Sequence, residues 1–199
     1  MMNGMYRRIR PLLLGAAACF AFAAESPKIG VQLLGGWPTG SMRSDFTTKT
    51  GYGAGVFADW TVGEGRMFRL AYDGLWYGKD NSPDNASPAA VLAEGDRNCR
   101  SHSFTAQYLI YPLRDTEGFY CKVGLGGMNQ ISRIDSTLTS PGNLNSRVTL
   151  LQESGTRLNC LAGIGYDFNE HWGAMAQYSF ITVDTRTLGS VQTGISYRF

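Results

Sequence analysis

The chain has 199 residues, 17% of them charged, and a formal net charge of +2 at pH 7. Three of its 18 Lys and Arg residues, Arg7, Arg8 and Arg10, stand before an N-terminal apolar run. The rest of the chain has 15 basic residues and 16 Asp and Glu, so its net charge is close to zero. The chain is long enough for one domain and has no basic cluster beyond this segment, which excludes the electrostatic footprint of a nucleic-acid-binding protein.

The N-terminus predicts a secretory signal peptide over residues 1–23, followed by a single mature domain over residues 24–199. The arginines precede an apolar run, and residues 21–23, Ala-Phe-Ala, fit a small-x-small cleavage site. One alternative is a membrane-spanning helix, but the run is shorter than the roughly 20 apolar residues that a bilayer requires. A lipid anchor at Cys19 is the other alternative, although the usual preceding leucine is missing.

Eight stretches of the mature chain alternate between apolar residues and polar or small ones, which is the period-two pattern of half-buried strands. In the first stretch, Ile29, Val31 and Leu33 oppose Gly30 and Gln32. The fourth stretch alternates least cleanly. The predicted strands cover residues 28–37, 52–60, 66–77, 103–113, 119–131, 157–168, 172–183 and 190–199.

The connections between these strands alternate in length. Short turns follow the second, fourth and sixth strands, whereas residues 39–50, 79–100 and 132–154 form long connections after the first, third and fifth. Alternate connections of an up-and-down sheet lie at one end, so the long loops share one rim. This asymmetry is typical of outer-membrane barrels, whose short turns are periplasmic. We therefore predict an all-β fold, an eight-stranded antiparallel up-and-down transmembrane β-barrel.

The two faces of the predicted strands differ in chemistry. The apolar face carries aromatic residues near the strand ends, as expected for rings at two membrane interfaces. The polar face has both charge signs and many glycines, so it can form a paired network inside a narrow barrel. The residues expected in this interior polar network are Asp59, Arg69, Asp73, Lys122, Arg157, Asp167 and Arg198. A soluble barrel with an apolar interior is the alternative, but it does not explain the aromatic residues at the strand ends.

The ending V-Q-T-G-I-S-Y-R-F resembles the C-terminal strand of outer-membrane barrels, with Phe199 terminal, Tyr197 third from the end and Ile195 fifth. The mature chain is most similar to the small OmpA/OmpX-like and Ail/Lom-like barrels. The resemblance implies residence in the outer membrane of a Gram-negative envelope, contact with its lipid, and an assembly signal in Phe199, Tyr197 and Ile195 that the barrel-assembly machinery reads.

One histidine stands in a sequence that could support catalysis. His102 lies between Ser101 and Ser103 in CRSHSF, with Glu94 and Asp96 upstream, so a serine, a histidine and an acid could meet at the outer rim. Lipid A deacylases of the PagL type are barrels with such a triad. Nothing in the sequence fixes the nucleophile beside its base, and a polar loop end explains the same residues.

The mature chain has three cysteines, an odd number that cannot be fully paired within one chain. Their spacing matches no zinc motif. We expect Cys121 and Cys160 to be small wall residues and Cys99 to be a loop thiol. No cofactor or metal site is expected.

The expected function is non-enzymatic: a monomeric barrel that contributes to envelope structure or contacts a surface partner through its extracellular loops. Two alternatives remain open. One is a lipid-modifying enzyme at the rim, and the other is a small channel or a carrier of an apolar ligand.

Overall fold

The computed structural model describes residues 26–40, 42, 49–80, 95–113, 117–139, 145–183 and 186–199. The expected signal peptide, residues 1–23, lies outside these described residues. The strands are β1 (Lys28–Gly40), β2 (Gly51–Gly63), β3 (Arg66–Asp80), β4 (Gly95–Ile110), β5 (Gly118–Thr139), β6 (Asn145–Asp167), β7 (Trp172–Val183) and β8 (Arg186–Arg198).

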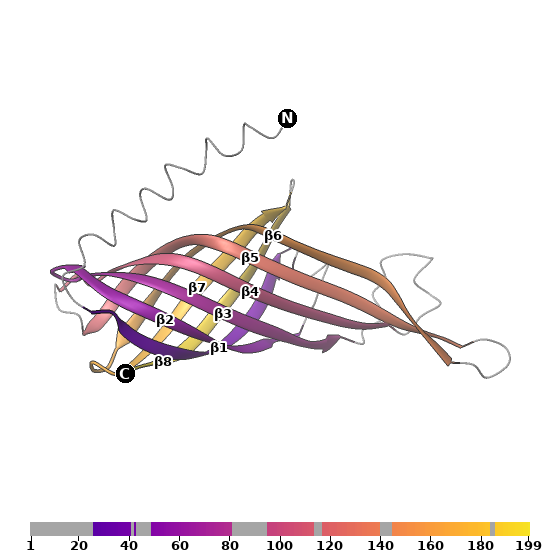
Figure 1. Cartoon of the computed structure of the whole chain (residues 1–199), viewed down its shortest axis with the longest axis horizontal. Coiled ribbons are helices and arrows are strands. Elements are labelled where there is room, and N and C mark those ends of the chain that lie inside the picture. Colours follow the sequence, from indigo (N-terminus) through magenta and orange to yellow (C-terminus); the bar gives the residue numbers. More distant parts are fainter. Residues whose placement is uncertain are drawn as a thin grey trace, which may run out of the picture.

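The eight strands form one closed barrel (Figure 1). Each strand pairs antiparallel with the next along the chain, and β1 pairs with β8 in a ladder from Gly30↔Arg198 to Gly40↔Leu188. The predicted fold class is therefore confirmed. Among the described residues, no helix is long and apolar enough to cross a membrane.

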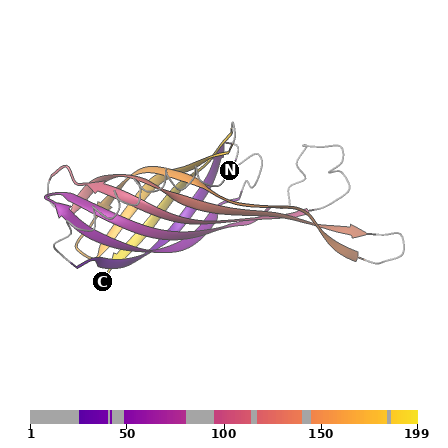
Figure 2. The same cartoon turned by 45° about the horizontal axis from the view of Figure 1, so that its top comes forward.

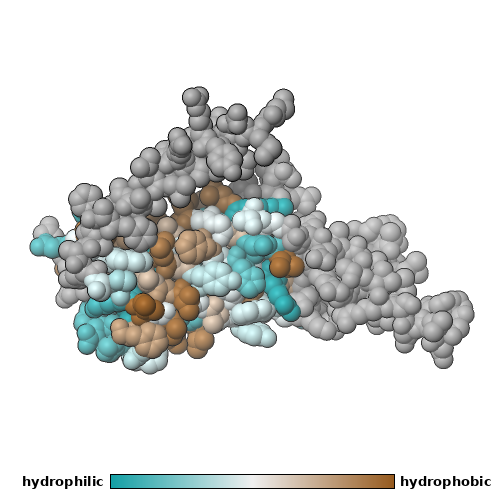
Figure 3. Space-filling view, viewed as in Figure 1, coloured by the Kyte–Doolittle hydropathy of each residue, from teal (hydrophilic) through white to brown (hydrophobic). Residues whose placement is uncertain are grey.

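The large apolar side chains of the barrel wall point outward. On β4, Phe104 is 57% exposed and Ile110 is 45% exposed, whereas Leu109 is fully buried. The fourth predicted strand, which has the weakest alternation, therefore has its apolar face outward, as predicted. Figure 3 shows hydrophobic side chains gathered over the wall of the barrel, a surface suited to lipid and not to water.

Aromatic side chains mark both ends of this wall. Tyr52 and Trp76 are cross-strand partners near the end that carries the long connections, and Trp60 and Phe68 pair near the other end with ring centroids 6.0 Å apart. On β2, Val56 lies midway between Tyr52 and Trp60 and faces outward. The outward face of this one strand therefore crosses the wall from one aromatic belt to the other.

The prediction of a long loop over residues 132–154 is wrong for most of that range. β5 and β6 continue as a paired hairpin from Gly118↔Asp167 to Thr139↔Asn145. This hairpin projects beyond the rest of the barrel (Figures 1 and 2). Strand β4 likewise begins at Gly95, inside the predicted loop 79–100. Beyond the membrane both faces of a strand can meet water, so these segments pair without the apolar alternation that predicts a membrane strand.

Substitution of Val56 by Arg tests the outward facing and the depth of the wall. We expect Val56→Arg to lower the free energy of unfolding by about 2–4 kcal/mol, because the guanidinium would lie at the bilayer midplane, and Tyr52→Arg by about 0–1 kcal/mol at the interface. Equilibrium denaturant unfolding in lipid vesicles measures both values. Equal costs at the two positions would contradict the assigned depth.

Candidate functional site

A cluster of four charged side chains fills the turn end of the barrel. Asp59 on β2 and Arg69 on β3 are cross-strand partners, and the guanidinium contacts the carboxylate twice, with Nε to Oδ1 at 2.6 Å and Nη2 to Oδ2 at 2.8 Å. Arg198 on β8 donates from Nε to Asp59 at 2.9 Å and from Nη2 to Asp167 on β6 at 2.9 Å. Two carboxylates and two guanidiniums therefore neutralise one another across the lumen.

Aromatic and apolar side chains complete this end. The Tyr111 hydroxyl donates to Asp167 Oδ2 at 2.6 Å, and its ring lies 5.2 Å from that of Tyr120. The Arg69 guanidinium carbon lies 3.9 Å from the centroid of the Phe57 ring, at cation–π distance. The buried apolar layer here consists of Met67, Leu109, Tyr111 and Tyr120.

Amides and hydroxyls occupy the middle of the barrel. Gln177 donates to Gln192 at 2.6 Å, and Gln192 donates to Ser190 at 3.0 Å. Gln32 donates to Asp73. These contacts pair the amide N–H groups of Gln32, Gln177 and Gln192, which cannot reach bulk water, whereas the side-chain oxygens of Gln32 and Gln177 have no hydrogen-bond partner among the described residues.

The seven residues expected in the interior network divide into two groups. Six of them are at most 3% exposed and point inward: Asp59, Arg69, Asp73, Lys122, Asp167 and Arg198. Arg157 lies on the same face of β6 but is only half-buried, toward the long-loop end. Among the described residues, the ion pairs of the cluster join Asp59, Arg69, Asp167 and Arg198, and Arg157 is not one of them.

Two glycines of the inner face make space for their cross-strand neighbours. A Cβ at Gly55 would lie 1.9 Å from Asp73 Oδ1, and one at Gly165 would lie 2.2 Å from the Tyr120 ring. These two positions therefore admit the Asp73 carboxylate and the Tyr120 ring into a narrow lumen.

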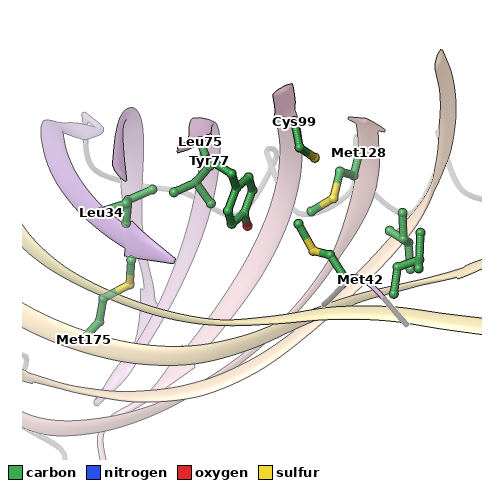
Figure 4. Close-up of a cluster of buried hydrophobic side chains, with 9 residues drawn as sticks. Leu34, Met42, Leu75, Tyr77, Cys99, Met128 and Met175 are labelled. Carbon is green, nitrogen blue, oxygen red and sulfur yellow. The ribbon is translucent and has the colours of Figure 1, made fainter. Parts of the chain in front are cut away.

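The loop end of the interior is apolar, which the sequence reasoning missed. The buried layer contains Leu34, Met42, Leu75, Tyr77, Cys99, Met128, Met175, Ile181 and Leu188 (Figure 4). The expectation that Cys99 is a loop thiol is wrong: it belongs to β4 and is 1% exposed. Cys121 and Cys160 do face outward from the wall, one exposed and the other half-buried. The inward parity of Leu34 and Leu75 was visible in the sequence and was the available signal for this layer.

His102 does not meet the neighbouring serines. It faces outward on β4, where its Nδ1 lies 3.1 Å from the Tyr72 hydroxyl and its ring makes an edge contact with Trp76. Ser101 and Ser103 are buried on the opposite, inward face. The strand geometry therefore separates the imidazole from both hydroxyls. Glu94 lies outside the described residues, and so does the side chain of Asp96.

The C-terminal strand is held at the turn end by two partners. Phe199 N–H donates to Ile29 O of β1 at 2.9 Å, and Arg198 N–H donates to His171 O at 2.8 Å. His171 Nδ1 lies 3.0 Å from Arg198 O, so this nitrogen carries the proton, since a carbonyl oxygen can only accept. The His171 ring also stacks on Tyr197. Phe199 itself is 72% exposed on the outer wall, in edge contact with Tyr197.

Removal of the Asp59 charge tests the cluster. We expect Asp59→Asn to lower the free energy of unfolding by about 3–5 kcal/mol, because it leaves the buried Arg69 charge uncompensated. The double variant Asp59→Asn/Arg69→Met removes both charges and keeps the Arg198–Asp167 pair, so it should recover part of the loss. Urea titration of the refolded barrel measures both. A single variant within about 0.5 kcal/mol of wild type, as at an ordinary surface position, would contradict the role of the cluster.

Comparison with known proteins agrees with this architecture. The family model of the outer membrane protein beta-barrel domain matches residues 11–199. No curated protein matches the chain. Ail of Yersinia pestis, the attachment invasion locus protein, is similar in structure with a TM-score of 0.56 and 17% identity over 87% of this chain and 98% of Ail.

Two further solved structures share the fold. The N-terminal β-barrel domain of Pseudomonas aeruginosa OprF has a TM-score of 0.52 and 16% identity, covering 86% of this chain and 97% of that domain. A major outer membrane protein from Thermus thermophilus has a TM-score of 0.55 and 11% identity, covering 88% of this chain and 100% of that protein. Likeness at these identities extends to the fold, whereas the family match spans nearly the whole sequence. The chain therefore belongs to the outer membrane protein beta-barrel domain family, and its barrel lies in the outer membrane.

Proposed function

We propose that the protein is a non-enzymatic surface protein whose barrel anchors a projecting β-sheet that contacts a partner outside the cell. The observation that carries this proposal is the unequal length of the strands at the loop end. β7 pairs with β6 only from Asn159 to Asp167, whereas β5 follows β6 as far as Asn145. Residues 145–158 of β6 therefore form a sheet edge that β7 does not cover.

Such an edge is suited to recognition. Its backbone N–H and C=O groups can pair with an added strand, which is the basis of β-augmentation. At about 3.3 Å per residue, residues 145–158 extend roughly 40 Å, more than the roughly 30 Å thickness of the hydrocarbon core. The hairpin thus offers a long binding surface well outside the bilayer.

The interior supports an anchoring role over an open pore. An eight-stranded barrel leaves a lumen that side chains can fill. Here, two apolar layers and a neutral charge cluster, with amides between them, occupy that lumen. The rigid scaffold below the hairpin favours a role in contact and envelope structure.

Truncation of the hairpin tests this function. Ser132 and Glu153 are cross-strand partners, so replacement of residues 133–152 by Asn-Gly should close them with a two-residue turn. We expect the variant barrel to fold and reach the outer membrane, while bacteria that express it lose adhesion to cultured epithelial cells and to immobilised heparin. Heparin is chosen as a probe because Ail has been solved in complex with the heparin analogue sucrose octasulfate.

The matched control is the full-length protein at the same surface level, verified by the faster gel migration of the unboiled barrel. Unchanged adhesion of the truncated variant to both surfaces would contradict the proposed contact role.

We further infer that Phe199, Tyr197 and Ile195 are the signal read by the barrel-assembly machinery after export directed by residues 1–23. Phe199 and Ile195 are exposed on the outer wall of the last strand, where a partner can reach them before the barrel closes.

Phe199→Ala is expected to reduce the amount of barrel in the outer membrane about as much as deletion of the residue, while the refolded barrel keeps its free energy of unfolding. Phe168→Ala is the matched control, since Phe168 is another exposed aromatic residue at the turn end. Quantitative blotting of outer-membrane fractions measures the levels. Normal levels of the Phe199 variant, or equal losses for both, would overturn the signal.

A further inference from the structure

A row of polar side chains interrupts the apolar outer wall at the loop end of the barrel. His102 on β4 is the cross-strand partner of Asn129 on β5, and Asn129 is the partner of Thr156 on β6. Directly paired residues have Cβ atoms about 4.5–5.5 Å apart, so the three polar groups are contiguous. Arg100, two residues before His102, is exposed and is the partner of Trp76 in the aromatic belt. The row therefore lies at the extracellular membrane interface.

The groups in this row can bind a phosphate together with a hydroxyl or an amide. Among the described residues, the ion pairs do not include Arg100, whose planar guanidinium matches the geometry of a phosphate. Tyr72 O–H can donate to His102 Nδ1 at 3.1 Å, which leaves the imidazole proton on Nε2 as a second donor. Asn129 Oδ1 has no hydrogen-bond partner among the described residues, so a half turn of the amide toward a ligand O–H or N–H would satisfy it.

The same three strands become apolar two residues nearer the midplane. Phe104 on β4 pairs with Gly127 on β5, and Gly127 pairs with Leu158 on β6. Phe104 and Leu158 are both exposed, and the strands that carry them are roughly 10 Å apart. A Cβ at Gly127 would meet, apart from its chain neighbours, only the Thr156 methyl within 4 Å, at 3.5 Å. The two large side chains therefore flank a gap that an acyl chain can occupy.

We propose that this part of the wall binds one phosphorylated sugar lipid of the outer leaflet. Arg100 and His102 hold its phosphate, Asn129 accepts from its hydroxyl or amide, and one acyl chain lies in the gap at Gly127. A polar row above an apolar gap fits an amphipathic molecule better than a soluble anion. The loop end is extracellular, which selects the outer leaflet. The site lies on the wall below the projecting hairpin, so it is independent of the proposed adhesive function.

The test uses the refolded full-length barrel in a non-ionic detergent, with purified lipid A as the probe. Native mass spectrometry counts the bound lipid and measures its affinity. We expect one lipid A per barrel, and binding at least about tenfold weaker for lipid A without its phosphates, because hydrogen bonds to a charged group contribute at least that factor. Equal binding of the dephosphorylated lipid would overturn the proposal. Displacement of lipid A by soluble glucosamine phosphate would do the same, since it would show a site for the headgroup alone.

Arg100→Gln removes the cation that holds the phosphate and should also weaken lipid A binding at least about tenfold. Arg66→Gln is the matched control, because Arg66 is an exposed arginine at the turn end, where it alternates with buried Met67. This control should bind as the wild type does. Unchanged affinity of Arg100→Gln would refute the phosphate contact, and equal losses in both variants would show general charge attraction and no site.

Gly127→Val tests the gap for the acyl chain. The added side chain meets the Thr156 methyl at an ordinary contact distance, so the barrel should fold, and gel migration without boiling verifies that it does. We expect a lower affinity for lipid A, because valine fills the space between Phe104 and Leu158. Ala176→Val on β7 adds the same bulk elsewhere on the wall and should leave the affinity unchanged. A Gly127 variant that binds lipid A as tightly as the wild type would overturn the assigned position of the lipid.

Discussion

Closure of the sheet between β1 and β8 is the constraint on which the rest of the structure depends. Inside lipid no water is present to satisfy backbone groups, so every strand must have a neighbour on both sides. The first and last strands supply this pairing to each other, and the ladder reaches the chain terminus, where Phe199 N–H bonds to Ile29 O.

Closure also determines the chemistry of the interior. Asp59 contacts Arg69, ten residues away in the sequence, and Arg198, 139 residues away. The local pair can form within the β2–β3 hairpin, whereas the distant pair requires that β8 has paired with β1, the strand next to β2. Arg198 then also engages Asp167 of β6. The charge cluster thus couples strands that share no backbone ladder, and a buried guanidinium is tolerated because closure supplies its second carboxylate.

The sequence predicted those parts of the fold in which two environments differ sharply. Val56 and Phe104 had to face lipid, and Asp59 and Arg69 could not, so alternation assigned both faces of the wall. The alternation predicted less of the fold where both faces of a strand meet the same environment. Residues 132–139 and 145–154 pair outside the membrane, where no face must be apolar, so their composition resembles a loop. Met128 and Cys99 are buried although nothing in their immediate sequence marks an apolar interior. The contacts of Asp59 with Arg198 depend on closure, which local patterns do not encode.

The same boundary separates a wall whose register is fixed from a projecting hairpin that lies outside the bilayer. Within the wall, a one-residue change of register would place Val56 inside and Asp59 in lipid, so the pairing is fixed by solvation. Past the aromatic belt that includes Tyr52 and Trp76, backbone pairing continues along the β5–β6 hairpin, where solvation no longer requires one face to be apolar. The apolar layer of Leu75 and Leu188 lies at this transition inside the barrel. It separates the fixed polar interior from the hairpin, so residues beyond it can change without disturbing the charge cluster that holds the strands together.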